Sequence, residues 1–132
     1  SYNFHAYEPS NNQFVRIRSI NTYDESYVNN PSEIENAIKQ TYSTLESGVS
    51  KLETNIPVKN SSGSDATINS DKNTRTYKVV IVVPDSADMS TVNTAVSNFK
   101  AKNPGVDVEV KTGYGDPTNN TKVEANKTES VG

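Results

Sequence analysis

The strongest hydrophobic pattern in the chain lies between residues 77 and 111, and it predicts a strand, a helix and a second strand. Residues 77–83 are apolar on both alternating faces, which is typical of a central strand covered on both sides. The helix is predicted from four apolar residues that share one face at helical spacing, namely Val92, Ala95, Val96 and Phe99. Pro104 and Gly105 end this helix, and residues 106–111 then alternate valine with charged residues, as in a half-buried strand. We expect the core to form around Val79, Ile81, Val83, Val96 and Phe99.

The N-terminal part of the chain alternates in the same way on both sides of a turn. Residues 2–7 and 14–20 are separated by a Pro-Ser-Asn-Asn sequence, so a β-hairpin is expected. Residues 21–30 are polar, but they contain Tyr23 and Tyr27, whose rings require cover. We therefore expect an ordered loop there.

A second helix is predicted from residue 32 onward. Ser32 and Glu35 have the spacing of a capping box, and Gly48 stands where a C-terminal cap belongs. The apolar stripe of this helix consists of Ile34, Ala37, Ile38, Tyr42 and Leu45. Residues 49–58 follow with strand alternation, and Pro57 favours an edge position or a strand end.

The remaining segments are polar. Residues 59–74 are predicted to form an irregular, mobile loop, and residues 113–132 a flexible tail. The predicted fold class is α+β, with a small sheet of three to five strands and two helices packed on one face. The chain is expected to form one domain over residues 1–112. In it, a hairpin and loop (1–30) precede an αββαβ core (32–111).

Composition and charge narrow the classes of function. Only 32% of the 132 residues are hydrophobic, Trp is absent and the mean hydropathy is −0.73, so the core must come from a few strong segments. The net charge of −3, without a basic stripe, disfavours nucleic-acid binding. No apolar run is long enough to span a membrane. Because the chain begins without Met, we expect a mature fragment whose only link to a membrane is an upstream anchor that has been removed.

Few residues are suited to catalysis. The chain has no Cys, and His5 is its single His, so one copy cannot form a Cys-His pair or a zinc site of several Cys or His ligands. On a hairpin near the terminus, His5 is expected to be a surface or packing residue and not the His of a Ser-His-Asp triad. Asp85 and Asp88 suit the start of a helix better than a cation site. Asp107 and Glu109 suit a solvated strand face better than a calcium or sugar site. We therefore expect a protein that is not an enzyme, with no catalytic residue, metal site or cofactor.

Aromatic residues are the best candidates for binding. They gather in the N-terminal third of the chain, and the predicted interaction residues are Tyr2, Phe4, Tyr7, Tyr23 and Tyr27. The alternative is that these rings only cover one face of the hairpin and loop.

The turn residues between positions 46 and 111 resemble those of a known arrangement of helices and strands. Gly48-Val49 precedes an amphipathic strand, a polar insertion follows, and the strand at 77–83, the helix from Ser90 and the strand after Pro104-Gly105-Val106 close the pattern. This order resembles the ring-building motif of bacterial envelope assemblies. The last thirty residues of this segment are also similar to bacterial sporulation lipoproteins with an Asn-Pro-X-Val turn between helix and strand. The resemblance implies a non-catalytic, extracytoplasmic assembly domain of a membrane-anchored envelope protein.

The expected partners are other envelope-complex proteins or copies of the same chain. Composition and size also fit a subunit of a Gram-positive secretion or conjugation machine. The alternative is a secreted or surface-displayed module that binds a cell-wall glycan or a host protein through its aromatic residues. Either function places the domain outside the cytoplasm.

Overall fold

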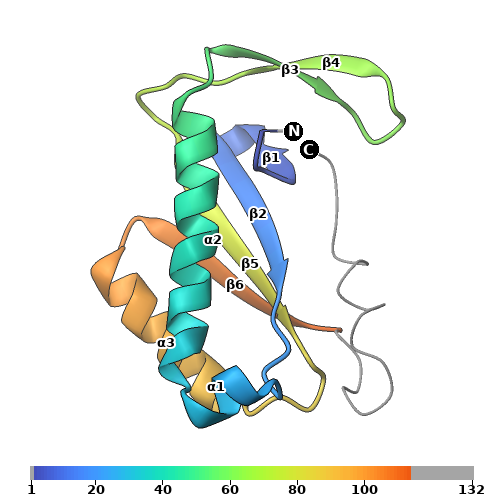
Figure 1. The fold of residues 1–132 in the computed structure, drawn as a ribbon. Coiled ribbons are helices and arrows are strands. Elements are labelled where there is room, and N and C mark those ends of the chain that lie inside the picture. Colours follow the sequence, from blue (N-terminus) through green and yellow to red (C-terminus); the bar gives the residue numbers. More distant parts are fainter. Residues whose placement is uncertain (1, 114–132) are drawn as a thin grey trace.

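A computed structural model describes residues 2–113 of the chain, and Figure 1 shows its fold. Two strands at the N-terminus are joined by a 3-10 turn, Pro9–Asn11. The strands are β1 (Ala6–Glu8), β2 (Gln13–Ser19), β3 (Asn55–Lys59), β4 (Asp65–Asn69), β5 (Thr76–Val83) and β6 (Val106–Thr112). The helices are α1 (Glu25–Asn29), α2 (Ser32–Ser50) and α3 (Met89–Lys102).

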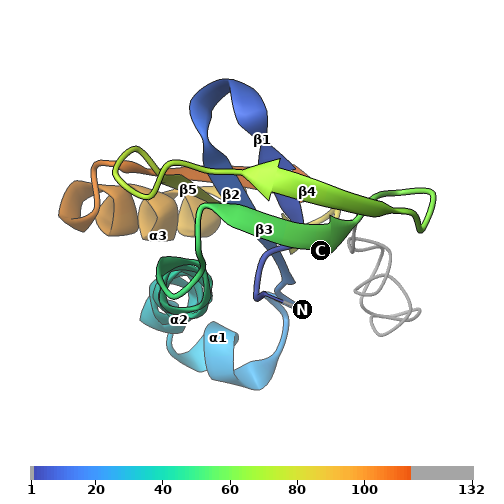
Figure 2. The same cartoon turned by 90° about the horizontal axis from the view of Figure 1, so that it is seen from above.

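The main sheet has four strands in the order β1-β2-β5-β6. Strand β1 pairs with β2 in antiparallel fashion, which confirms the predicted N-terminal hairpin. Strands β2, β5 and β6 are parallel, with Val79 opposite Arg16 on one side and Val108 on the other. Helices α2 and α3 both pack on one face of this sheet (Figures 1 and 2). The predicted α+β class, with two helices on one face of a small sheet, is therefore confirmed.

Strand β5 is the central strand, and both of its faces are shielded. The side chains of Val79, Ile81 and Val83 are fully buried beneath the helices. On the opposite face, Val80 and Val82 are buried beside two partly buried side chains of β2. The predicted face of α3 is also confirmed, because Val92, Ala95 and Phe99 are buried and Val96 packs against them. The two-sided apolar pattern of residues 77–83 thus arises from the central place of β5.

Both predicted caps of α2 are wrong. The residue before the helix is Pro31, which makes no side-chain cap, and the Ser32 hydroxyl instead donates to Asn30 Oδ1 at 2.6 Å. Helix α2 also continues past Gly48 to Ser50. Gly48 is required for a different reason, since a Cβ at this position would lie 2.7 Å from Asn3 Nδ2 and 2.9 Å from the Tyr2 carbonyl oxygen. The N-terminal segment therefore crosses α2 at its only glycine.

The polar segment 59–74 was predicted to be an irregular loop, and this prediction is wrong. It contains β4, which pairs with β3 to form a separate two-stranded sheet at one end of the molecule (Figures 1 and 2). Ile56 and Val58 lie opposite Ile68 and Ala66, so the few apolar residues of this segment all contribute to one face. The order from residue 32 onward is consequently αβββαβ, and β3 does not join the main sheet.

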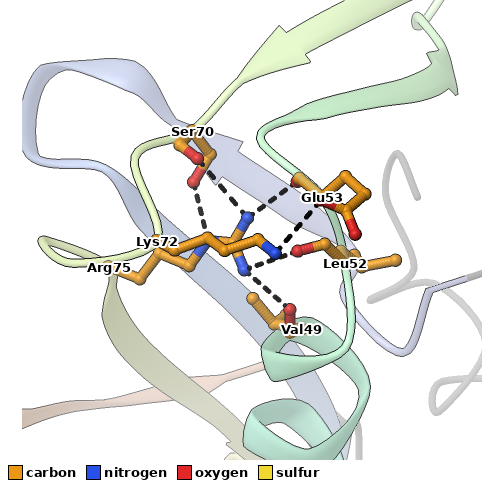
Figure 3. Close-up of polar contacts among 6 residues, drawn as sticks. All are labelled: Val49, Leu52, Glu53, Ser70, Lys72 and Arg75. Carbon is orange, nitrogen blue, oxygen red and sulfur yellow. Dashed lines mark hydrogen bonds and ion pairs between the residues drawn. The ribbon is translucent and has the colours of Figure 1, made fainter.

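Arg75 attaches this second sheet to the body of the protein (Figure 3). Its guanidinium donates to the carbonyl oxygens of Val49 at 2.9 Å, Leu52 at 3.2 Å and Glu53 at 2.9 Å. Its Nε donates to Ser70 Oγ at 3.0 Å. One side chain therefore links the end of α2, the approach to β3 and the chain leaving β4. A two-stranded sheet is only marginally stable alone, so this anchorage is needed.

Two further segments bear on the sequence predictions. The expected loop at 21–30 contains the five-residue helix α1. Asp24 is the N-cap of this helix, and its side chain accepts a hydrogen bond from the Ser26 amide. Most of the predicted tail, residues 114–132, lies outside the described residues. Within residues 2–113, none of the helices is both long and apolar enough to cross a bilayer.

Candidate interaction site

A groove lies where parallel strands β2 and β5 reach their carboxyl ends. Its volume is about 290 Å³. The loop after β2, helix α1, the start of α2, the loop after β5 and the start of α3 all contribute to it. The lining residues are Thr22, Tyr23, Tyr27, Val28, Pro31, Ile34, Ser86, Asp88, Thr91 and Val92. Parallel α/β sheets bind ligands at this edge, because the loops that follow the strands converge there.

The groove has an apolar floor and an exposed apolar rim. Ile34 and Val92 belong to the buried core and form part of the lining. Tyr23 is 48% exposed and Val28 is 58% exposed, and these are the two exposed large hydrophobic residues of the described chain. Both line the groove. The groove therefore combines a buried apolar floor with two exposed apolar side chains.

Hydrogen bonds fix the rim. The Tyr23 hydroxyl donates to the carbonyl oxygen of Ser86 at 2.6 Å and lies 3.1 Å from Ser86 Oγ. This contact connects the loop after β2 with the loop after β5, across 63 residues of sequence. The ring of Tyr23 is therefore held in position although nearly half of its surface is exposed, so binding a partner would cost little additional side-chain order.

Asp88 closes the groove at the start of α3. Its Oδ1 accepts hydrogen bonds from the amides of Ser90 at 3.1 Å and Thr91 at 3.4 Å. These bonds stabilise the carboxylate and hold the Asp88 pKa below its ordinary value. The predicted role of Asp88 at a helix start is therefore confirmed. Asp85 is exposed in the preceding loop.

A second, more polar hollow of about 320 Å³ adjoins the groove between α2 and α3. The two share Pro31 and Thr91. Its lining residues include Glu35 and five residues with a hydroxyl or amide side chain, namely Ser32, Ser90, Thr91, Thr94 and Asn98. Glu35 forms an ion pair with Lys102 at 2.7 Å. The two hollows therefore lie next to each other at the starts of α2 and α3.

The five predicted interaction residues divide between two places. Tyr23 and Tyr27 line the groove. Tyr2, Phe4 and Tyr7 lie at the opposite end of α2, where they pack with Phe14, Leu45, Val49 and Ile56. Phe4 is only 2% exposed, and its ring lies 5.0 Å from that of Phe14 in an edge-to-face contact. Phe4 and Tyr7 also line a separate hollow of about 190 Å³ beside β3 and β4. Tyr23 is the one exposed aromatic residue of the described chain, and Tyr27 is half-buried.

The other candidate residues have structural partners. His5 Nδ1 accepts a hydrogen bond from the Ile17 amide at 2.9 Å. Asp107 Oδ2 accepts from Gln13 Nε2 at 2.8 Å, and Glu109 pairs with Lys78 at 2.6 Å. Within residues 2–113, no group of three or more His, Asp or Glu side chains is placed to hold a metal ion.

Shifted pKa values do not single out a catalytic pair. Burial raises the pKa of Tyr42 and Tyr77, with a further increase from the charge of Glu46. The hydrogen bond from Lys78 lowers the pKa of Glu109. Only Asp88 belongs to the groove, and its shift comes from capping a helix. Each of these shifts has a structural cause.

The sequence did not reveal the groove as a unit. Val28, Pro31, Thr91 and Val92 contribute to it but were not considered as binding residues. The sequence feature that could have indicated the groove is Val28, a single aliphatic residue near Tyr23 and Tyr27 in an otherwise polar segment. Placing the loop after β5 beside it required the parallel pairing of β2 and β5.

Comparisons with known proteins give little further guidance. No protein-family model and no curated protein matches the chain. Among solved structures, the chain is similar to one from the "CdiA-CT/CdiI toxin and immunity complex from Yersinia pseudotuberculosis", with 18% sequence identity and a TM-score of 0.48. The match covers 83% of this chain and 81% of the other. A similarity at this level assigns neither a family nor a function to the chain.

Proposed function

We propose that this domain is a non-catalytic protein-interaction module and that the groove at the carboxyl ends of β2 and β5 is its binding site. One observation carries the proposal. The two exposed large hydrophobic side chains of the described residues, Tyr23 and Val28, lie on the same groove. Interfaces are enriched in tyrosine, and apolar side chains held at a rim are suited to burial by a partner.

The architecture supports this role. The residues of the groove come from five segments that the sheet and two helices hold in place, so the surface exists before a partner arrives. Preorganisation of this kind lowers the entropic cost of association. The Tyr23 contact with Ser86 is the most direct sign of it, because it ties two of these segments together.

The more specific proposal places the module in a bacterial envelope assembly. It rests on the strand, helix and Pro104-Gly105-Val106 strand of residues 77–111, whose order resembles the ring-building motif, and on the cysteine-free composition. The continuation of α2 past Gly48 and the separate β3–β4 sheet depart from that motif. In this proposal the domain is extracytoplasmic, belongs to a membrane-anchored protein and contacts other envelope-complex proteins or copies of itself. A subunit of a secretion or conjugation machine fits the same description.

A matched pair of substitutions tests the proposed function. Val28→Thr replaces a methyl group with a hydroxyl group and almost keeps the shape of the side chain. Val28→Ile keeps the side chain apolar. Capture of the tagged full-length protein from its native host, followed by quantitative mass spectrometry, should recover one partner with the wild type and Val28→Ile. Recovery with Val28→Thr should fall at least about fivefold. Equal recovery with all three proteins would contradict the proposal.

A second candidate function is glycan binding by a surface-displayed module. The observation that favours it is the exposed Tyr23 ring, which lines the groove together with the hydroxyl of Thr22 and the carboxylate of Asp88. Sugar rings stack on tyrosine, and sugar hydroxyl groups donate hydrogen bonds to a carboxylate and both donate to and accept from a hydroxyl group. Binding of soluble cell-wall fragments that is lost in Tyr23→Ser and retained in Tyr23→Phe would support this candidate over the first.

A further inference from the structure

The groove lies at a strongly acidic end of the molecule. Residues 19–38 and 84–99, which supply its lining, contain six carboxylates and no lysine or arginine. The carboxylates are Asp24, Glu25, Glu33, Glu35, Asp85 and Asp88. Of these, Glu35 is paired with Lys102. The net charge of the whole chain is only −3, so negative charge is concentrated here.

Some of these acids have roles within the protein. Asp24 and Asp88 cap α1 and α3, and carboxylates are favoured at helix starts. The amide hydrogen bonds that Asp88 accepts favour its charged form and lower its pKa. Glu25 and Asp85 are exposed and flank the groove residues in sequence. The exposed carboxylates of Glu25 and Asp85 therefore place negative charge next to groove residues, which would disfavour an acidic partner.

The shape of the depression indicates an extended occupant. The apolar groove and the more polar hollow adjoin at Pro31 and Thr91, and their volumes are about 290 and 320 Å³. Both are open at the surface between α2 and α3. A chain segment of a few residues fits such a depression, with one side chain on the apolar floor and polar backbone groups beside the hydroxyls of Ser32, Ser90 and Thr94.

We propose that the groove binds a cationic peptide segment, in which an aliphatic or aromatic residue enters beside Tyr23 and Val28 and flanking lysines or arginines face the surrounding carboxylates. This inference rests on the proposed function and specifies the chemistry of the partner. Charge complementarity selects this occupant, since a second copy of the groove would bring like charges together. Association should weaken as salt rises, because exposed carboxylates are screened.

Synthetic peptides test the proposal. The probe is the blocked heptapeptide Lys-Leu-Lys-Leu-Lys-Leu-Lys, compared with versions in which Glu replaces Lys or Ser replaces Leu. Each is titrated into the ¹⁵N-labelled full chain, and amide shifts are followed. The first peptide should bind saturably, with shifts concentrated at residues 20–34 and 86–98. The Glu version should not bind, and the Ser version should bind at least about tenfold more weakly.

Variants separate charge from apolar contact. The double variant Glu25→Gln with Asp85→Asn should weaken binding several-fold and flatten its salt dependence, and Val28→Thr should weaken binding without changing that dependence. Asp65→Asn on β4 removes a carboxylate outside the groove and should have no effect. Equal binding of the Glu version, shifts centred elsewhere, or no binding at millimolar peptide would overturn the proposal.

Failure of the cationic-segment inference can be distinguished from failure of the proposed interaction function. A partner captured through Val28 whose contacting segment is acidic or uncharged would overturn the cationic-segment inference and leave the interaction module intact. Saturable shifts at the groove from N-acetylglucosamine oligomers, with none from the lysine-leucine peptide, would overturn both in favour of a glycan site.

Discussion

Gly48 in α2 lies directly against Asn3 of the N-terminal segment, so close that a methyl group at Gly48 would overlap the Asn3 side chain. Asn3 itself has a φ of 67°, a left-handed conformation that Asn tolerates better than most residues. Asn3 and Gly48 together allow the chain to cross α2 and place Phe4 in the core. The crossing thus depends on two small local features rather than on a large interface.

Gly48→Ala should therefore destabilise the protein although alanine favours helices. Alanine in place of glycine gains about 1 kcal/mol of helix propensity. The new Cβ would meet the Tyr2 carbonyl oxygen at 2.9 Å, so the N-terminal segment must move. We expect a lower midpoint of thermal unfolding and faster amide exchange at residues 3–5. An increase in the midpoint would show that the segment does not pack on α2.

Arg75→Ala should release the β3–β4 sheet. Hydrogen bonds to a charged donor contribute about 1.5–3 kcal/mol each, although such contributions do not add, so we expect a loss of at least about 2 kcal/mol. Arg75→Lys should restore little, because an ammonium group cannot reach the carbonyl oxygens of Val49, Leu52 and Glu53 together. Chemical denaturation measures the loss, and amide exchange should rise first at residues 55–69.

Phe99→Ala should cost about 3–5 kcal/mol, the usual loss when a core aromatic is truncated. Phe99 is 1% exposed, and its ring lies 6.0 Å from that of Tyr42 in an edge-to-face contact. Phe99→Leu should cost much less, since it keeps most of the volume. Equal, negligible losses for both variants in urea unfolding would contradict the placement of α3 on the sheet.

Acid should weaken the start of α3 through Asp88. The folded-state pKa of this carboxyl is lowered by the amides of Ser90 and Thr91, so its contribution is fully present above the unfolded-state pKa. The contribution is lost as pH falls through the lower, folded-state pKa. Asp88→Asn keeps a capping oxygen but has no charge, so its stability deficit at pH 7 should shrink toward pH 2. A deficit that is independent of pH would contradict this role.

Helices and strands were predicted best from the sequence where one hydrophobic periodicity runs through a long segment. Strand β5 and helix α3 were recognised because their apolar residues repeat without interruption. Strand β4 was missed because only Ala66 and Ile68 are apolar in it, and its pairing with β3 depends on the anchorage by Arg75. Gly48 was misread because a cap and a close crossing both require glycine, and only the structure shows the Asn3 contact.

The candidate site was predicted in part. Tyr23 and Tyr27 were selected because aromatic residues are common at interaction surfaces, and both line the groove. They were grouped with Tyr2 and Tyr7, which are near in sequence but lie at the other end of the 19-residue helix α2. A helix of this length spans about 28 Å, so two clusters that are neighbours in sequence are far apart in the fold.

Site-specific photo-crosslinking tests the central claim most directly. A photoreactive amino acid is placed at position 28 on the groove, and in a matched protein at position 67 on the exposed face of β4, in the full-length protein within its native host. Position 28 should crosslink to one protein, through a segment rich in lysine or arginine, and position 67 should give far fewer crosslinks. Crosslinks that form equally at both positions, or only at position 67, would contradict it.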